Sequence, residues 1–106
     1  IDVDSGLSVL GNIELYNETL GYFLESIEER LIKLNNWKNA NNLKNYAIEV
    51  NALKSDCNYL GFKDLLNITT IHELEANNNN LEFINNNYQT LINEVVRLVN
   101  VARKYL

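Results

Sequence analysis

The feature that most constrains the fold is the alternating three- and four-residue spacing of apolar side chains along the chain. This spacing gathers the apolar residues on one stripe of an α-helix, whereas a half-buried strand would alternate with a period of two. The first stripe follows Asn12, a good N-cap residue, and we expect its helix to end within residues 35–42, where asparagines crowd around Trp37. Its apolar members are Ile13, Tyr16, Leu20, Phe23, Ile27, Leu31 and Leu34.

Three more helical stripes follow, each bounded by turn residues. The second begins after Asn42 and ends at Gly61, a natural C-terminal stop for a helix. The third covers residues 62–75, and the asparagine run at residues 77–80 forms the turn before the fourth. Their apolar members are Leu43, Tyr46, Val50, Leu53, Cys57 and Leu60; then Phe62, Leu65, Ile68, Ile71 and Leu74; then Leu81, Ile84, Tyr88, Leu91, Val95, Leu98, Ala102 and Tyr105.

Four amphipathic helices with short connections predict an all-α fold, arranged as an antiparallel up-down four-helix bundle. The leading residues 4–10 are expected to form a short N-terminal helix that caps one end of it. A length of 106 residues suits one domain over residues 1–106, large enough to bury a core without metal or disulfide. Because the chain begins at Ile1 and contains no methionine, we expect this domain to be cut from a longer protein.

Composition excludes several classes of partner. Nine basic and fourteen acidic residues give a net charge of −5, which argues against nucleic acid, because phosphate binding needs clustered Lys and Arg. No apolar run approaches the ~18–20 residues that span a bilayer, and no signal peptide is recognisable, so we expect a cytoplasmic protein that does not contact a membrane. The acidic surface, poor in apolar patches, predicts a monomer.

Metal and cofactor binding are not expected either. Cys57 is the only cysteine and His72 the only histidine, so neither has the partners that a zinc site requires. Cys57 lies on the second stripe and should be a small core residue. His72 lies about 100° away from the third stripe, and we expect it to be a half-exposed surface residue.

The second helical segment carries the most specific pattern, since residues 46–61 read YAIEVNALKSDCNYLG. This resembles the motif of histidine phosphotransfer (Hpt) domains, His-x-Leu-Lys-Gly/Ser followed by Leu-Gly. Lys54 and Ser55 stand three and four residues after the acceptor position, and Leu60 and Gly61 stand nine and ten after it. The opening of the chain is also similar to the start of that family, so the resemblance covers nearly the whole sequence. It departs at the acceptor position, where the family has histidine and this chain has Asn51.

The helical geometry around position 51 can be examined independently of the family. With Val50 at the centre of the buried stripe, Asn51 lies about 100° around the helix, on a flank that should be at least partly exposed. A lysine beside small residues on this flank predicts a shallow, open, mildly positive patch. Gly61 belongs to the same motif and completes the candidate binding residues. The flank itself holds Lys44, Ala47, Asn51, Lys54, Ser55 and Asn58.

Asn51 should not accept phosphate. Its amide nitrogen lone pair is delocalised into the carbonyl, whereas a neutral imidazole offers a free lone pair near pH 7. His72 is a poor substitute acceptor, because Glu75 and not a lysine stands three residues after it, and its acidic neighbours would repel a phosphoryl group.

The resemblance therefore implies a phosphorelay module of a two-component system that docks the receiver domain of a response regulator or hybrid kinase. With Asn51 in place of histidine, we expect binding without phosphotransfer, in either a naturally degenerate domain or a deliberate His-to-Asn form. The alternative is a structural or oligomerising helical domain in which the motif is a relic. An enzyme is not expected, because the sequence has no nucleotide-binding glycine loop and no nucleophile–base pair.

Overall fold

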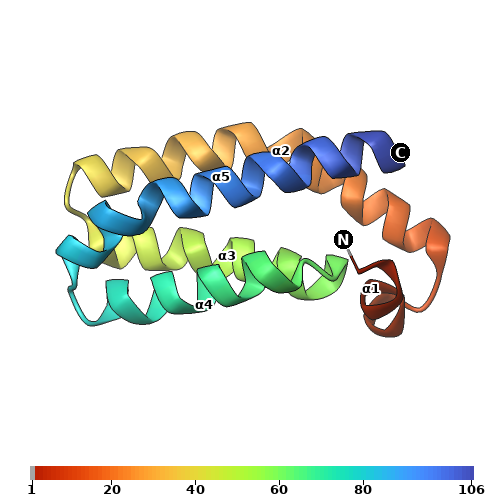
Figure 1. The fold of residues 1–106 in the computed structure, drawn as a ribbon, viewed down its shortest axis with the longest axis horizontal. Coiled ribbons are helices and arrows are strands. Elements are labelled where there is room, and N and C mark those ends of the chain that lie inside the picture. The colour runs from red at the N-terminus through yellow and green to blue at the C-terminus, as the bar shows by residue number, and fades with distance from the viewer. Residues whose placement is uncertain (1) are drawn as a thin grey trace.

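The computed structural model describes residues 2–106, except for the side chains of residues 5 and 9. Over this range the chain is all-helical and contains no strand. Four long helices run along the longest axis, each opposite in direction to the one before, and a short helix lies at one end (Figure 1). The five helices are α1 (Val3–Leu10), α2 (Ile13–Asn39), α3 (Leu43–Leu60), α4 (Lys63–Asn77) and α5 (Leu81–Tyr105).

Asparagine side chains start three of the long helices. The Oδ1 atom of Asn12 accepts from the backbone N–H of residue 15 at 2.7 Å, and Asn42 and Asn80 do the same for residues 45 and 83 at 3.1 Å. Such bonds satisfy N–H groups that have no partner within the helix. Asn41 and Asn79 precede two of these caps with φ of 55° and 58°, in the left-handed region that asparagine tolerates. Asparagines therefore form the turns before α3 and α5, and the predicted turn in the run of residues 77–80 is confirmed for residues 78–80.

Gly61 ends α3 in the left-handed conformation, with φ of 73°, and α4 begins at Lys63. The predicted helix boundary at Gly61 is thus confirmed. The carbonyl of Gly61 accepts from the backbone N–H of Asp2 at 3.0 Å, and a Cβ on Gly61 would lie 1.9 Å from the Asp2 carbonyl oxygen. The segment before α1 therefore sits directly on this turn, a contact that only glycine permits. Helix α1 lies beside the α3–α4 turn in Figure 1, so a short helix does lie at one end of the molecule.

The first helix ends at Asn39, within the predicted range of residues 35–42. It continues into the asparagine-rich segment because its last turns pack on the rest of the protein. Leu34 is buried, Trp37 is half-buried against the core, and the Lys38 ammonium lies 4.8 Å from the ring centroid of Tyr88 on α5. Tertiary contacts here outweigh the modest helix propensity of asparagine.

The buried stripe of α4 differs from the prediction. Leu65 is buried as expected, but Ile71 and Leu74 are about half exposed. The side chains that α4 buries are Leu65, Thr69, His72 and Ala76. Thr69 tolerates burial because its hydroxyl donates to the Leu65 carbonyl at 2.8 Å. The expectation that His72 would be half-exposed is therefore wrong, since only 2% of its surface is accessible.

Apolar side chains from α2, α3, α4 and α5 form one core. Helix α3 contributes its whole predicted stripe, since Leu43, Tyr46, Val50, Leu53, Cys57 and Leu60 are all buried. None of the described helices is long and apolar enough to cross a membrane.

Candidate docking site on α3

Helix α3 presents the motif residues to solvent as predicted. Asn51 and Ser55 are exposed and Lys54 is partly exposed, whereas Val50, Leu53 and Cys57 on the opposite side are at most 3% exposed. The Ser55 hydroxyl donates to the Asn51 carbonyl at 3.2 Å, which keeps it close to the helix backbone. The three motif side chains thus lie on one open flank in the middle of the helix.

A glutamate on α4 joins Asn51 to Lys54. The Asn51 amide Nδ2 donates to Oε2 of Glu73 at 2.5 Å, and the Lys54 ammonium donates to Oε1 at 2.6 Å. The Lys54 hydrogen bond is the main cause that lowers the pKa of the Glu73 carboxyl, so this residue is ionised at neutral pH. Glu73 therefore neutralises the charge of Lys54, which the prediction of a mildly positive patch did not include.

Glu73 was not found as a site residue from the sequence. It lies 22 residues from Asn51, and the predicted α4 stripe through Ile71 and Leu74 did not place it beside α3. In the structure the buried stripe of α4 runs through Leu65, Thr69 and His72. A prediction based on that stripe would have placed Glu73 beside α3.

Ala47 and Lys44 complete one end of this flank. Ala47 was expected to be exposed, but only 5% of it is accessible, because the side chain lies on the part of α3 that the core covers. It still lines the bottom of an open hollow of about 300 Å³ between α3 and α4. Lys44 is exposed at the rim of this hollow. The residues around the hollow are Lys44, Ala47, Ile48, Asn51, Glu73 and Asn77.

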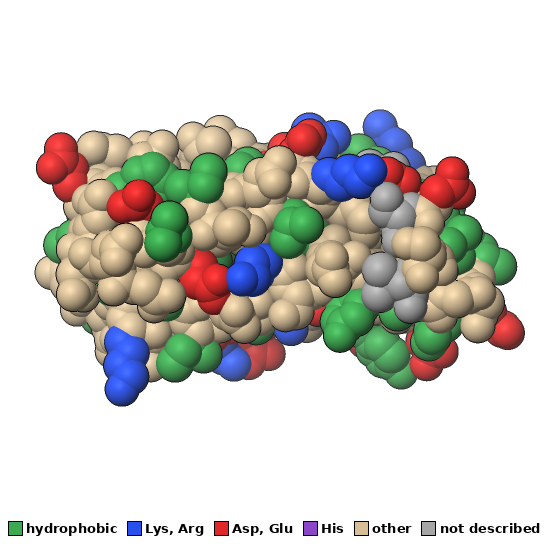
Figure 2. All heavy atoms as spheres, turned by 90° about the horizontal axis from the view of Figure 1, so that it is seen from below, with side chains coloured by type: hydrophobic (Ala, Val, Ile, Leu, Met, Phe, Trp, Pro, Cys, Tyr) green, Lys and Arg blue, Asp and Glu red, His purple; other side chains and the backbone are tan. Residues whose placement is uncertain are grey.

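A second open hollow, of about 440 Å³, lies toward the other end of the same helix pair. Lys54, Ser55 and Asn58 line it from α3 together with Tyr59, and Leu66, Asn67 and Thr70 from α4. The Lys54–Glu73 ion pair thus lies between two hollows. Figure 2, which views the molecule from the α4 side, shows acidic and basic side chains in small separate groups among uncharged ones. We call the exposed residues Lys44, Asn51, Lys54, Ser55 and Asn58, with Glu73, the docking strip.

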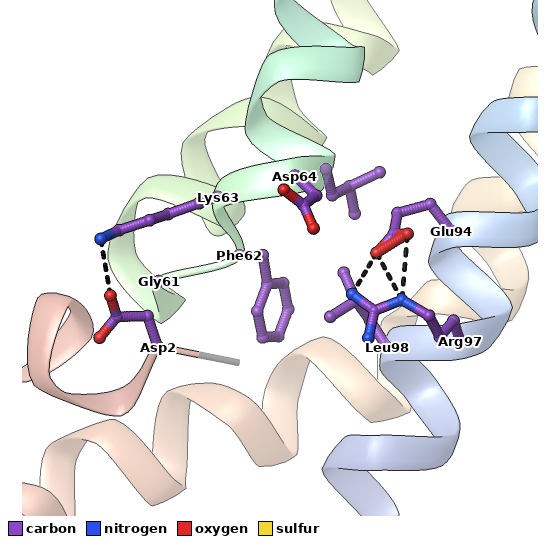
Figure 3. Close-up of a pocket in the computed structure, with 9 residues that line it drawn as sticks. Asp2, Gly61, Phe62, Lys63, Asp64, Glu94, Arg97 and Leu98 are labelled. Carbon is purple, nitrogen blue, oxygen red and sulfur yellow. Dashed lines mark hydrogen bonds and ion pairs between the residues drawn. The ribbon is translucent and has the colours of Figure 1, made fainter.

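Gly61 is not brought to the docking strip. It is buried and lines a different hollow, of about 290 Å³, at the α3–α4 turn (Figure 3). Two ion pairs lie at this hollow: the Lys63 ammonium is 2.7 Å from a carboxylate oxygen of Asp2, and Arg97 pairs with Glu94. Gly61 shapes the turn described above, and its assignment as a binding residue stays a prediction.

His72 and Cys57 are both inaccessible. The His72 ring is stacked with Tyr46 and in edge contact with Phe83, and its Nδ1 is hydrogen-bonded to the Tyr46 hydroxyl at 2.9 Å. Burial lowers the pKa of His72 to about 4, against a smaller opposing effect of a backbone hydrogen bond at Asn87. Burial also raises the pKa of the Cys57 thiol to about 12. A neutral, enclosed imidazole and a protonated, enclosed thiol cannot meet a partner's phosphoryl group.

Within residues 2–106 no group of three or more His, Cys, Asp or Glu side chains could hold a metal ion. What the docking strip offers chemically is an amide, a paired lysine, a hydroxyl and open space on both sides. Comparison with protein-family models, with curated proteins and with solved structures gives no match.

Proposed function

We propose that this protein is an Hpt-type signalling module that docks the receiver domain of a response regulator or hybrid kinase without carrying phosphate itself. In this proposal α2 to α5 form an antiparallel up-down four-helix bundle, and α1 caps the end at which Gly61 lies. The observation that carries the proposal is the position of Asn51, exposed at the middle of α3 with Lys54 one turn further along.

The chemistry of position 51 supports binding rather than transfer. An amide nitrogen is not a nucleophile, and here it is also engaged as a donor to Glu73. Phosphoryl transfer requires positioning and charge neutralisation, and the docking strip keeps open hollows for the first and a lysine for the second, which is paired with Glu73 in this structure. A surface that retains these elements without a nucleophile suits a module that tethers a receiver or competes for it.

The proposal includes a monomeric protein in the cytoplasm, where receiver domains are found. The alternative is a structural or oligomerising domain with a relic motif. Three aliphatic side chains that are more than half exposed favour this alternative. They are Ile32 on α2, Ile48 on α3 and Leu74 on α4, which are 62%, 59% and 58% accessible. Sedimentation velocity across a concentration series separates the two, because a monomer at all concentrations removes the support for self-association.

The test restores the nucleophile. Asn51→His should accept phosphate from a phosphorylated receiver domain, whereas the chain with Asn51 should not, measured by transfer of label within a panel of receivers. Asn58→His is the matched control, because it places an equally exposed imidazole on the same helix but has Gly61, not a lysine, three residues later.

Labelling of Asn51→His alone supports a docking surface that has lost only its acceptor. If no receiver labels Asn51→His, or if Asn58→His is labelled as well, position 51 has no special place in transfer. The structural reading then takes precedence.

A further inference from the structure

We propose that Glu73 makes the docking strip select the unphosphorylated form of its partner over the phosphorylated form. This inference rests on the proposed function, because it concerns the same strip. It assigns a role to a residue that lies outside the Hpt-like motif on α3.

Glu73 occupies both donors that the motif would offer to a phosphoryl group. Its Oε1 accepts from Lys54 at 2.6 Å and its Oε2 from Asn51 at 2.5 Å, so each carboxylate oxygen is matched to one donor. The side chain of Glu73 is only 19% exposed and that of Lys54 30%, so the ion pair lies partly out of the solvent. Charge-assisted bonds of this kind are shorter and stronger than neutral ones.

The same contact fixes what Asn51 shows to a partner. An ionised carboxylate can only accept hydrogen bonds, so the amide must turn its NH₂ group toward Glu73. The Asn51 carbonyl oxygen is then the end that remains for a partner. Position 51 therefore presents an acceptor, which fits an N–H donor or a cation and repels a phosphoryl oxygen.

A phosphorylated partner would bring a second anion to this point. To reach Lys54, its phosphoryl group must displace Glu73, and the carboxylate would then remain close by as an unpaired like charge. At a partly buried position such a repulsion exceeds its value in bulk water. Lys44 is an additional cation of the strip, but it lies two helical turns, about 10 Å, from Asn51 and should attract both forms of an acidic partner.

The experiment compares affinities for a receiver domain with and without beryllofluoride, which binds the acceptor carboxylate and imitates its phosphoryl group. The original chain should bind the free receiver about five- to tenfold more tightly than the beryllofluoride form. Glu73→Gln should abolish or reverse this preference, because Lys54 then becomes available to the added anion. The matched control is Glu75→Gln, which changes the net charge equally but involves a side chain that bonds Asn80 on the other side of the turn.

Equal affinities of the original chain for the two receiver forms would overturn the inference while leaving the docking proposal in place. So would a preference that Glu73→Gln does not change, or that Glu75→Gln changes by as much. If neither the original chain nor Glu73→Gln binds either form of any receiver in the panel, the proposed function fails, and the inference fails with it. Circular dichroism of each variant establishes that the helices are intact.

Discussion

Helices α3 and α4 are joined by two polar contacts that come from neighbouring residues of α4 and meet very different surroundings. His72 points into the core and bonds the Tyr46 hydroxyl, whereas Glu73 lies at the surface and bonds Asn51 and Lys54. The first contact is 2% exposed or less on both sides, and the second includes an exposed Asn51. We call them the buried contact and the surface contact.

Of the two contacts, only the surface contact is able to serve binding. A buried polar pair has no water to replace a lost partner, so it fixes how the helices pack and must stay closed. A surface pair can exchange its partners for water or for another protein at small cost. The buried contact should therefore determine stability, and the surface contact should determine recognition.

The largest expected effect is that of His72→Ala. It removes a ring that packs on Tyr46 and Phe83 and leaves the Tyr46 hydroxyl without its partner, so the free energy of unfolding should fall by about 4 kcal/mol. Urea denaturation measures the loss. Thr70→Ala, an exposed position on α4, is the control and should change little. If His72→Ala lowers the free energy of unfolding by less than about 1 kcal/mol, the buried contact does not determine stability more than the surface contact does.

The pH dependence of unfolding should separate the contacts as well. The folded pKa of His72 is about 4 and the ordinary value is 6.5, so the unfolded chain binds more protons between these values. The free energy of unfolding should have its full value above pH 6.5 and should decrease by about 3 kcal/mol as the pH falls to 4. In His72→Gln the free energy of unfolding should change little between pH 6.5 and 4. A decrease that persists in this variant would contradict the assignment of the pH dependence to His72.

Glu73 should contribute to the pH profile only at lower pH. Its folded pKa lies below the ordinary 4.5, so its stabilisation is present above that value and is lost as the pH falls through the folded pKa. The two contacts thus act in different windows of one titration.

The smallest expected effect on stability is that of Glu73→Gln. Because the surface ion pair is partly solvated, the free energy of unfolding should fall by less than about 1 kcal/mol, and the loss should shrink further in high salt. Thermal unfolding at low and high salt measures it. A loss of more than about 2 kcal/mol would mean that the surface contact, too, holds the helices together.

Most of the helical layout is predictable from sequence, for local reasons. Asn12, Asn42 and Asn80 cap helices, and Gly61 ends one, through bonds and backbone conformations that depend on a few adjacent residues. The exposed side of α3 also follows, because its apolar stripe is unambiguous.

The α4 stripe and the site that depends on it are not predictable in this way. Apolar and polar residues compete for the buried side of α4, and His72 is buried because Tyr46, 26 residues earlier, supplies a hydrogen bond. Glu73 reaches Asn51 for the same reason, that the rotation of α4 is fixed by contacts between helices. The charge of the docking strip could therefore not be derived from the motif on α3 alone.

A map of the surface that meets a receiver domain tests most directly whether the docking strip is the binding surface. Backbone amide chemical shifts of the isotopically labelled chain would be followed by NMR during titration with an unlabelled receiver. We expect the perturbed amides to cluster along residues 44–58 of α3 and around Glu73 on α4, while the amides of α2 and α5 stay unchanged. Perturbations confined to α2 and α5, or spread evenly over the molecule, would contradict this expectation.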